Sequence, residues 1–151
     1  MKEYCGSPTA SSGILVLRSW GATAWPQKKG RDMRVLICDE VEASRYLLSS
    51  IVTNAGHEAI PASNGHEALI LARENPPDII VSDILMPDMD GYALAQQWRV
   101  DERLAAIPFI FYSANYTEPD DERFAHNLGV DRFLIKPMEP DQLLREIERV
   151  L

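Results

Sequence analysis

Five apolar runs of strand length occur in the chain, and four of them are followed by residues that can take part in ionic or phosphoryl chemistry. Asp39 and Glu40 follow the first run, Asp83 the third, Ser113 the fourth and Lys136 the fifth. Three carboxylates held close together repel one another, so such a group requires a cation at neutral pH. Mg²⁺ suits them because it is a hard ion that takes oxygen ligands and keeps several of its waters.

The same residue types can carry a phosphoryl group. A carboxylate can attack phosphorus as a nucleophile and form an acyl phosphate. The charge of the transferring group can be neutralised jointly by a metal ion, a lysine ammonium and a hydroxyl group. A single acid after a strand more often caps a helix or forms a turn. Acids, a hydroxyl and a lysine after four strands of one sheet instead indicate phosphoryl chemistry at a Mg²⁺ site.

The elements that must position these residues are visible as alternating patterns. The apolar runs are rich in β-branched or aromatic residues, which is typical of parallel strands covered on both faces. They are Val35–Cys38, Glu58–Pro61, Ile79–Val81, Phe109–Tyr112 and Arg132–Ile135. Apolar residues at helical spacing lie between and after them and predict helices that pack on the sheet. These stripes are Leu47, Leu48 and Ile51; Ala68, Leu71 and Ala72; Leu94, Ala95 and Trp98; Phe124, Ala125 and Leu128; and Leu143, Leu144 and Ile147.

Helix boundaries agree with this pattern. Asn64 is expected to cap one helix, Gly56 and Gly129 to follow two others, and Pro140 to open the last. The alternation predicts an α/β fold, a doubly wound five-stranded parallel sheet with five helices, flavodoxin-like and of strand order 2-1-3-4-5. Such folds bind ligands at the carboxyl ends of their strands.

Two segments follow from composition. Residues 33–151 are predicted to form the α/β domain, and residues 1–32 a leader or linker that is mostly mobile. This first segment is rich in Ser, Gly, Thr and Ala and shows no periodicity. Gly13–Leu17 within it is the one short run that could add a strand.

The motifs at the strand ends resemble those of the receiver domain of two-component response regulators. The matching segments are Val35–Glu40, Pro77–Gly91, Ser113-Ala114 and Phe133–Pro137. The run from Asp83 to Gly91 is the most characteristic of them. The resemblance extends from about Met33 to Leu151 and implies a chemotaxis-regulator-like fold.

The resemblance implies a role for each acid. Asp83 is expected to accept the phosphoryl group, and Asp39, Glu40 and Asp83 to bind Mg²⁺ together with the backbone carbonyl of Leu85. The second acidic position holds Glu40, where aspartate is more usual in the family. The extra methylene is expected to shift the ion or to reach it through a water molecule.

The resemblance also implies a conformational switch. Ser113 and Lys136 are expected to contact the phosphoryl group, and Ser113 and Phe133 to change packing in response to it. Phe133 stands where the family more often has Tyr, so its switching rests on packing alone. The response is expected on the face formed by the fourth helix, the fifth strand and the fifth helix.

A domain of this family is expected to receive its phosphoryl group from a histidine kinase or a phosphotransfer protein. It is expected to act as a phosphoacceptor with at most autophosphatase activity, to control a fused or separate output domain, and to be compatible with a homodimer.

Fifteen Lys and Arg against 23 Asp and Glu, a net charge of −8, argue against direct nucleic-acid binding. No run approaches the roughly 20 apolar residues of a membrane span. Two cysteines without an evident export signal favour a reducing, cytoplasmic setting.

Two other functions remain open from the sequence. A haloacid-dehalogenase-type phosphohydrolase also uses Mg²⁺ and an aspartyl phosphate, but it needs Asp-x-Asp directly after a strand. Here Asp88-Met89-Asp90 follows Pro87, which is more typical of a loop and a helix cap. A pseudo-receiver without phosphorylation would not need the full set of acids, hydroxyl and lysine. The histidines share no ligand spacing and are expected at the surface: His57, His66 and His126.

Overall fold

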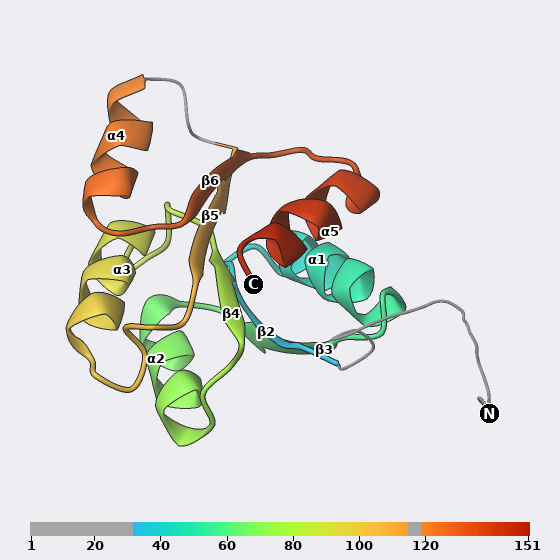
Figure 1. Ribbon diagram of the computed structural model, residues 1–151, viewed down its shortest axis with the longest axis horizontal. Coiled ribbons are helices and arrows are strands. Elements are labelled where there is room, and N and C mark those ends of the chain that lie inside the picture. The colour runs from blue at the N-terminus through green and yellow to red at the C-terminus, as the bar shows by residue number, and fades with distance from the viewer. Residues whose placement is uncertain (1–31, 115–118) are drawn as a thin grey trace, which may run out of the picture. The chain divides into compact units, whose positions relative to one another are not determined.

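The computed structural model describes residues 32–114 and 119–151, in which Met33–Leu151 form one compact unit. Its five parallel strands lie in the order β3-β2-β4-β5-β6 (Figure 1). Because β2 is the first strand of this unit in the chain, the order is 2-1-3-4-5, as predicted. The predictions for residues 1–31, including a strand at Gly13–Leu17, lie outside the described residues.

The strands match the predicted apolar runs closely. They are β2 (Arg34–Cys38), β3 (Glu58–Ala62), β4 (Ile79–Ser82), β5 (Phe109–Ser113) and β6 (Arg132–Ile135). Every residue of the central strand β4 is buried, as expected for a parallel strand covered on both faces. The main difference that matters for the site is that Ser113 is the last residue of β5 rather than the first residue after it.

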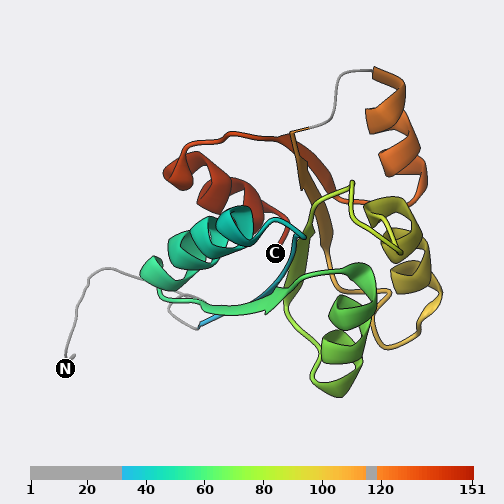
Figure 2. The same cartoon turned by 180° about the vertical axis from the view of Figure 1, so that it is seen from behind.

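The helices cover both faces of the sheet. They are α1 (Glu42–Asn54), α2 (Gly65–Glu74), α3 (Gly91–Val100), α4 (Pro119–Asn127) and α5 (Pro140–Arg149). α1 and α5 lie on one side of the sheet, and α2, α3 and α4 on the other (Figures 1 and 2). Two core clusters follow from this arrangement, one including Leu36, Trp98 and Phe111 and the other Ile37, Leu48 and Leu143.

Two residues of the predicted helix stripes do not pack as expected. Leu47 is 62% exposed, and α1 instead buries Leu48 and Val52, which lie four residues apart on one face of the helix. Phe124 of α4 is 47% exposed, although its ring meets the ring of Tyr92 edge to face at 4.9 Å. Apolar spacing alone therefore placed both residues wrongly.

The predicted helix boundaries are confirmed. Asn64 and Asp90 cap α2 and α3, since their side chains accept hydrogen bonds from the backbone N–H groups of Glu67 and Ala93, both at 2.8 Å. Pro140 opens α5. Gly56 and Gly129 have φ values of +94° and +84°, which favour glycine after a helix.

Gly91 is where α3 approaches the end of β4 most closely. A Cβ atom at this position would lie 2.5 Å from the backbone oxygen of Asp83 and 2.8 Å from the Cα of Ile84. A Cβ at Gly65, the equivalent first residue of α2, would meet only the Met89 side chain, at 2.9 Å. The α3 position must therefore be glycine for backbone reasons, whereas a flexible side chain can yield at the α2 position.

Gly91→Ala is expected to lower the free energy of unfolding by about 1–3 kcal/mol, because the backbone at Asp83 must move. Gly65→Ala is the matched control and should cost clearly less. Urea denaturation of both variants checks this. Equal stability of the two variants would show that the contact between Gly91 and Asp83 is not tight.

Candidate functional site

Four of the residues singled out from the sequence meet at the carboxyl edge of the sheet. Asp39 follows β2, Asp83 follows β4, Ser113 ends β5 and Lys136 follows β6. The parallel arrangement requires this, because all carboxyl ends of the strands lie at the same edge. Asp39, Asp83 and Ser113 are buried.

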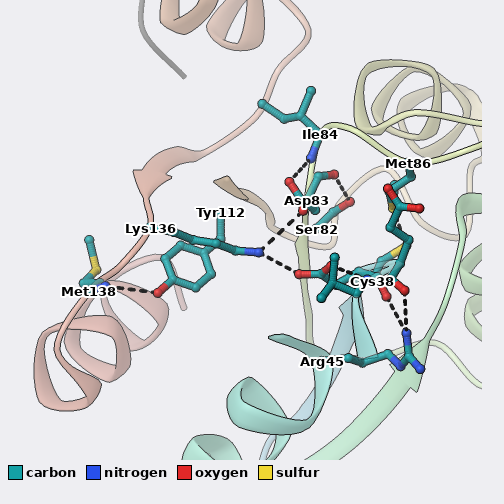
Figure 3. Close-up of polar contacts among 12 residues, drawn as sticks. Cys38, Arg45, Ser82, Asp83, Ile84, Met86, Tyr112, Lys136 and Met138 are labelled. Atoms are coloured by element: carbon teal, nitrogen blue, oxygen red, sulfur yellow. Dashed lines mark hydrogen bonds and ion pairs between the residues drawn. The ribbon is translucent and has the colours of Figure 1, made fainter. Parts of the chain in front are cut away.

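Lys136 joins the two aspartates (Figure 3). Its Nζ atom lies 2.7 Å from Oδ2 of Asp39 and 3.5 Å from Oδ2 of Asp83. The side chains of the three residues are only 17%, 7% and 10% exposed, in the order Lys136, Asp39 and Asp83. The ammonium also lies 5.5 Å from the centre of the Tyr112 ring. One positive charge thus serves two nearly buried carboxylates, which leaves the group with an excess negative charge.

The backbone fixes the orientation of both carboxylates. Val41 N–H donates to Oδ1 of Asp39 at 2.9 Å, and Ile84 N–H donates to Oδ1 of Asp83 at 2.7 Å. The second oxygen of each carboxylate is the one that faces Lys136. Both acids therefore keep one oxygen on the backbone and direct the other toward the shared ammonium.

The turn that carries Asp83 is itself tied to the sheet. Asp83 N–H donates to the carbonyl oxygen of Cys38 at 2.9 Å, and the Ser82 hydroxyl donates to the carbonyl oxygen of Asp83 at 2.7 Å. Gly91 N–H donates to the carbonyl oxygen of Ile84 at 2.7 Å. These bonds hold the carboxylate in place before any ligand binds.

Two further predicted site residues lie at the surface. Glu40 is exposed and Leu85 is 53% exposed, although the ligand predicted at Leu85 is its backbone carbonyl. Within the described ranges, no three His, Cys, Asp or Glu side chains form a group that could hold a metal ion. Glu40 is exposed and does not join the two buried aspartates. Ser113 is connected to Lys136 through the backbone, since its carbonyl oxygen accepts the Lys136 N–H at 3.1 Å.

Phe133 lies between the core and the surface. It is half-buried, and its ring meets that of Phe111 edge to face at 5.8 Å. A hollow of about 160 Å³ borders it, lined by Ala125, His126, Val130, Asp131, Arg132 and Phe133. Phe133 thus contacts the aromatic core through Phe111 and also lines the hollow.

Sequence reasoning missed Tyr112 and Arg45. The Tyr112 hydroxyl accepts the Met138 N–H at 3.2 Å, and its ring lies near the Lys136 ammonium. Arg45 bonds to the backbone beside Asp39. The only feature of the sequence that could have placed Tyr112 near the site is its position directly before Ser113. No feature of the sequence pointed to Arg45, because an arginine in a helix is usually solvated.

Several other residues have structural roles. Burial raises the pKa of the Cys38 thiol to about 12, so the thiol stays neutral; its sulfur lies 3.4 Å from that of Met86. His66 and His126 are exposed, but His57 is half-buried and accepts the Met33 N–H at 3.3 Å. Asp88 is an exposed loop residue. Asp90 caps α3, and β4 ends at Ser82. The pair Asp88 and Asp90 therefore does not follow a strand directly.

A family model described as the response regulator receiver domain matches residues 35–148 of the chain. The chain belongs to the response regulator receiver family. Receiver domains are generally non-enzymatic signalling domains. None of the helices in the described part of this receiver combines the length and hydropathy needed to cross a membrane.

Known receivers resemble the chain over most of its length. Protein PilH of Pseudomonas aeruginosa is 32% identical over 118 residues, which are 78% of this chain and 97% of PilH. The probable transcriptional regulator ycf27 of Porphyra purpurea is 35% identical over 118 residues, but these are only 47% of that protein. The solved structure of the chemotaxis protein CheY4 of Vibrio cholerae has a TM-score of 0.76 and 30% identity. The match covers 80% of this receiver and 100% of that chain. This receiver thus spans nearly all of PilH and about half of ycf27.

The shared ammonium leads to a prediction about stability without Mg²⁺. Lys136→Met leaves two buried carboxylates facing each other, so we expect the free energy of unfolding at pH 7 to fall by about 1–3 kcal/mol, a range reduced for the partial exposure of the group. Asp83→Asn removes one of the two negative charges and should instead raise the free energy of unfolding. Denaturation of both variants in the presence of EDTA measures these changes. A stabilised Lys136→Met variant would mean that burying the lysine costs more than its ion pairs return.

Proposed function

We propose that this receiver accepts a phosphoryl group on Asp83 in a Mg²⁺-dependent reaction. The observation that carries the proposal is the contact of one ammonium with two nearly buried carboxylates at the carboxyl edge of the sheet. Two acids and one lysine that are nearly buried are poorly balanced alone. A divalent cation and a phosphoryl group together add charges of both signs and complete the balance.

The proposed step is a simple displacement. A carboxylate oxygen of Asp83 attacks the phosphorus of a phosphohistidine, and a P–O bond forms while the P–N bond breaks. The electron pair of the P–N bond stays with the imidazole nitrogen, which takes up a proton from solvent. The Ile84 N–H keeps one Asp83 oxygen in place, so the attacking group is already oriented.

The donor set fits Mg²⁺. Asp39, Asp83 and the more exposed Glu40, with the backbone carbonyl of Leu85, offer only hard oxygen ligands. When bound, Mg²⁺ would neutralise charge on the phosphoryl oxygens. Glu40 must turn inward from its exposed position to take part, which its longer side chain permits.

Lys136 and Ser113 are proposed to hold the phosphoryl group. The Lys136 ammonium already lies near Asp83, and its closer partner, Asp39, is an acid that the cation would neutralise. The Ser113 hydroxyl would move toward the phosphoryl group, and Phe133 would then shift its packing between the aromatic core and the neighbouring hollow. Phosphorylation would thus favour one of two existing arrangements of the face formed by α4, β6 and α5.

The proposed partners follow from this chemistry. The phosphoryl donor is a histidine kinase or a phosphotransfer protein. The partner that this receiver controls is a fused or separate output domain. Family membership and the capping role of Asp90 favour this function over a haloacid-dehalogenase-type phosphohydrolase. The buried acid and lysine pair favours it over a pseudo-receiver.

Incubation with Mg²⁺ and acetyl phosphate should add one phosphoryl group to the intact mass of the protein. Asp83→Asn should abolish this gain, because it removes the nucleophile while leaving the fold intact. Asp88→Asn is the matched control, an exposed acid in the same loop, and should label normally. Intact mass spectrometry over time measures all three proteins.

The other outcomes separate the competing functions. Full labelling of Asp83→Asn would place the acceptor elsewhere. Continuous release of phosphate without a mass gain would indicate a phosphohydrolase, and neither gain nor release would indicate a pseudo-receiver.

Mg²⁺ should raise the thermal midpoint of the unphosphorylated protein, because it binds the folded site and relieves the repulsion of its acids. The double variant Asp39→Ala with Glu40→Ala should lose this response. A double variant of Asp101 and Glu102, an adjacent acidic pair in the α3–β5 loop, should keep it. Thermal melts with and without Mg²⁺ measure the shift in the midpoint. A shift that remains after loss of the Asp39 and Glu40 carboxylates would locate the ion at another site.

A further inference from the structure

Arg45 holds the acidic turn between β2 and α1 from the side opposite to Lys136 (Figure 3). Its Nη1 atom donates to the carbonyl oxygen of Asp39 at 2.7 Å and lies 3.4 Å from that of Glu40. Side chains of a helix lean toward its N-terminus, so a residue in the first turns of α1 can reach back to this turn. The guanidinium thereby fixes the peptide groups on both sides of Glu40.

The two acids of this turn are held very differently. The Asp39 carboxylate is fixed by the Val41 N–H and by Lys136. Glu40 is exposed, and in the part of the chain that the structure describes no hydrogen bond or ion pair holds its carboxylate. The direction of the Glu40 side chain therefore depends on the backbone of the turn, which Arg45 restrains.

The charge of Arg45 also reaches the start of α2, just after the turn between β3 and α2. The pKa of Glu67, in the first turn of α2, is lowered mainly by hydrogen bonds from the Ser63 N–H and hydroxyl, at 2.7 and 2.8 Å, with a smaller contribution from the charge of Arg45. The two turns are joined directly as well, since Asp39 N–H donates to the carbonyl oxygen of Ala62 at 3.1 Å. The turn that Arg45 restrains is thus tied to the end of the adjacent strand β3.

We propose that Arg45 is a positioning residue for the metal end of the site, acting through Glu40. The proposal rests on the Mg²⁺ site proposed above. Glutamate has one more rotatable bond than aspartate, so a ligand at this position needs a more rigid backbone to reach the same ion. Groups that orient metal ligands commonly change metal affinity by about 10–100-fold when they are removed.

The test is the Mg²⁺ affinity of the unphosphorylated receiver, measured from amide NMR shifts, which can follow even weak binding. Arg45→Met should weaken binding about tenfold, at the lower end of that range. Arg45→Lys should weaken it less, because an ammonium can still donate to one carbonyl oxygen but lacks the fork of the guanidinium. Arg103→Met removes the same charge in the α3–β5 loop and should bind like the wild type.

A double-mutant comparison separates positioning from a general structural effect. In a Glu40→Ala background, Arg45→Met should weaken Mg²⁺ binding by less than about twofold, since there is no carboxylate left to orient. A purely structural role would give the same loss in both backgrounds and would overturn the proposal.

The remaining outcomes are also decisive. Wild-type affinity in Arg45→Met would overturn the role of Arg45 and leave the Mg²⁺ site intact. Absence of Mg²⁺ binding by the wild type would overturn both the site and the role. If Arg45→Met does not fold, Arg45→Lys decides, and unchanged affinity in that variant would contradict the proposal.

Discussion

The ammonium group of Lys136 lies 2.7 Å from Asp39 and 3.5 Å from Asp83, and the three residues follow three different strands. Separating charges of this kind from water is costly unless each has a partner. The lysine meets that need only in part, because it brings one positive charge to two carboxylates. The site is therefore stable enough to form and still short of positive charge, which is the condition in which a cation binds readily.

The fold meets this constraint through its backbone. Parallel strands bring the acids and the lysine to one edge, and N–H groups of the following turns hold one oxygen of each carboxylate. Gly91 allows the start of α3 to lie directly against the backbone of Asp83. Phe111 contacts Phe133 of β6 and Tyr92 of α3, and Tyr92 in turn contacts Phe124 of α4. The same close packing that fixes the acids thus connects them to the face that is proposed to respond.

Much of this arrangement could be predicted from the sequence. Apolar runs and turn residues predicted the strands and helices, and Asn64 and Pro140 marked helix starts correctly. The strand order followed from the handedness of crossovers and the frequency of this order in α/β domains of this size. Periodicity could not decide which of the adjacent residues Leu47 and Leu48 is buried, because both fit one stripe. The ion pairs of Lys136 and the backbone contacts of Arg45 could not be predicted either, since they depend on rotamers and on turns that are distant in sequence. The sequence predicted that three acids would converge, but Glu40 extends toward solvent. Its direction also depends on the side-chain rotamer, which the sequence does not give.

Asp83 is the residue proposed to form the acyl phosphate. Borohydride reduces an aspartyl phosphate to homoserine, so peptide mass spectrometry after labelling and reduction identifies the acceptor directly. After labelling and reduction, the wild-type protein is expected to contain homoserine at position 83, in proportion to the phosphoryl group incorporated. Homoserine at position 39 or 88, or full labelling with aspartate intact at position 83, would contradict this proposal.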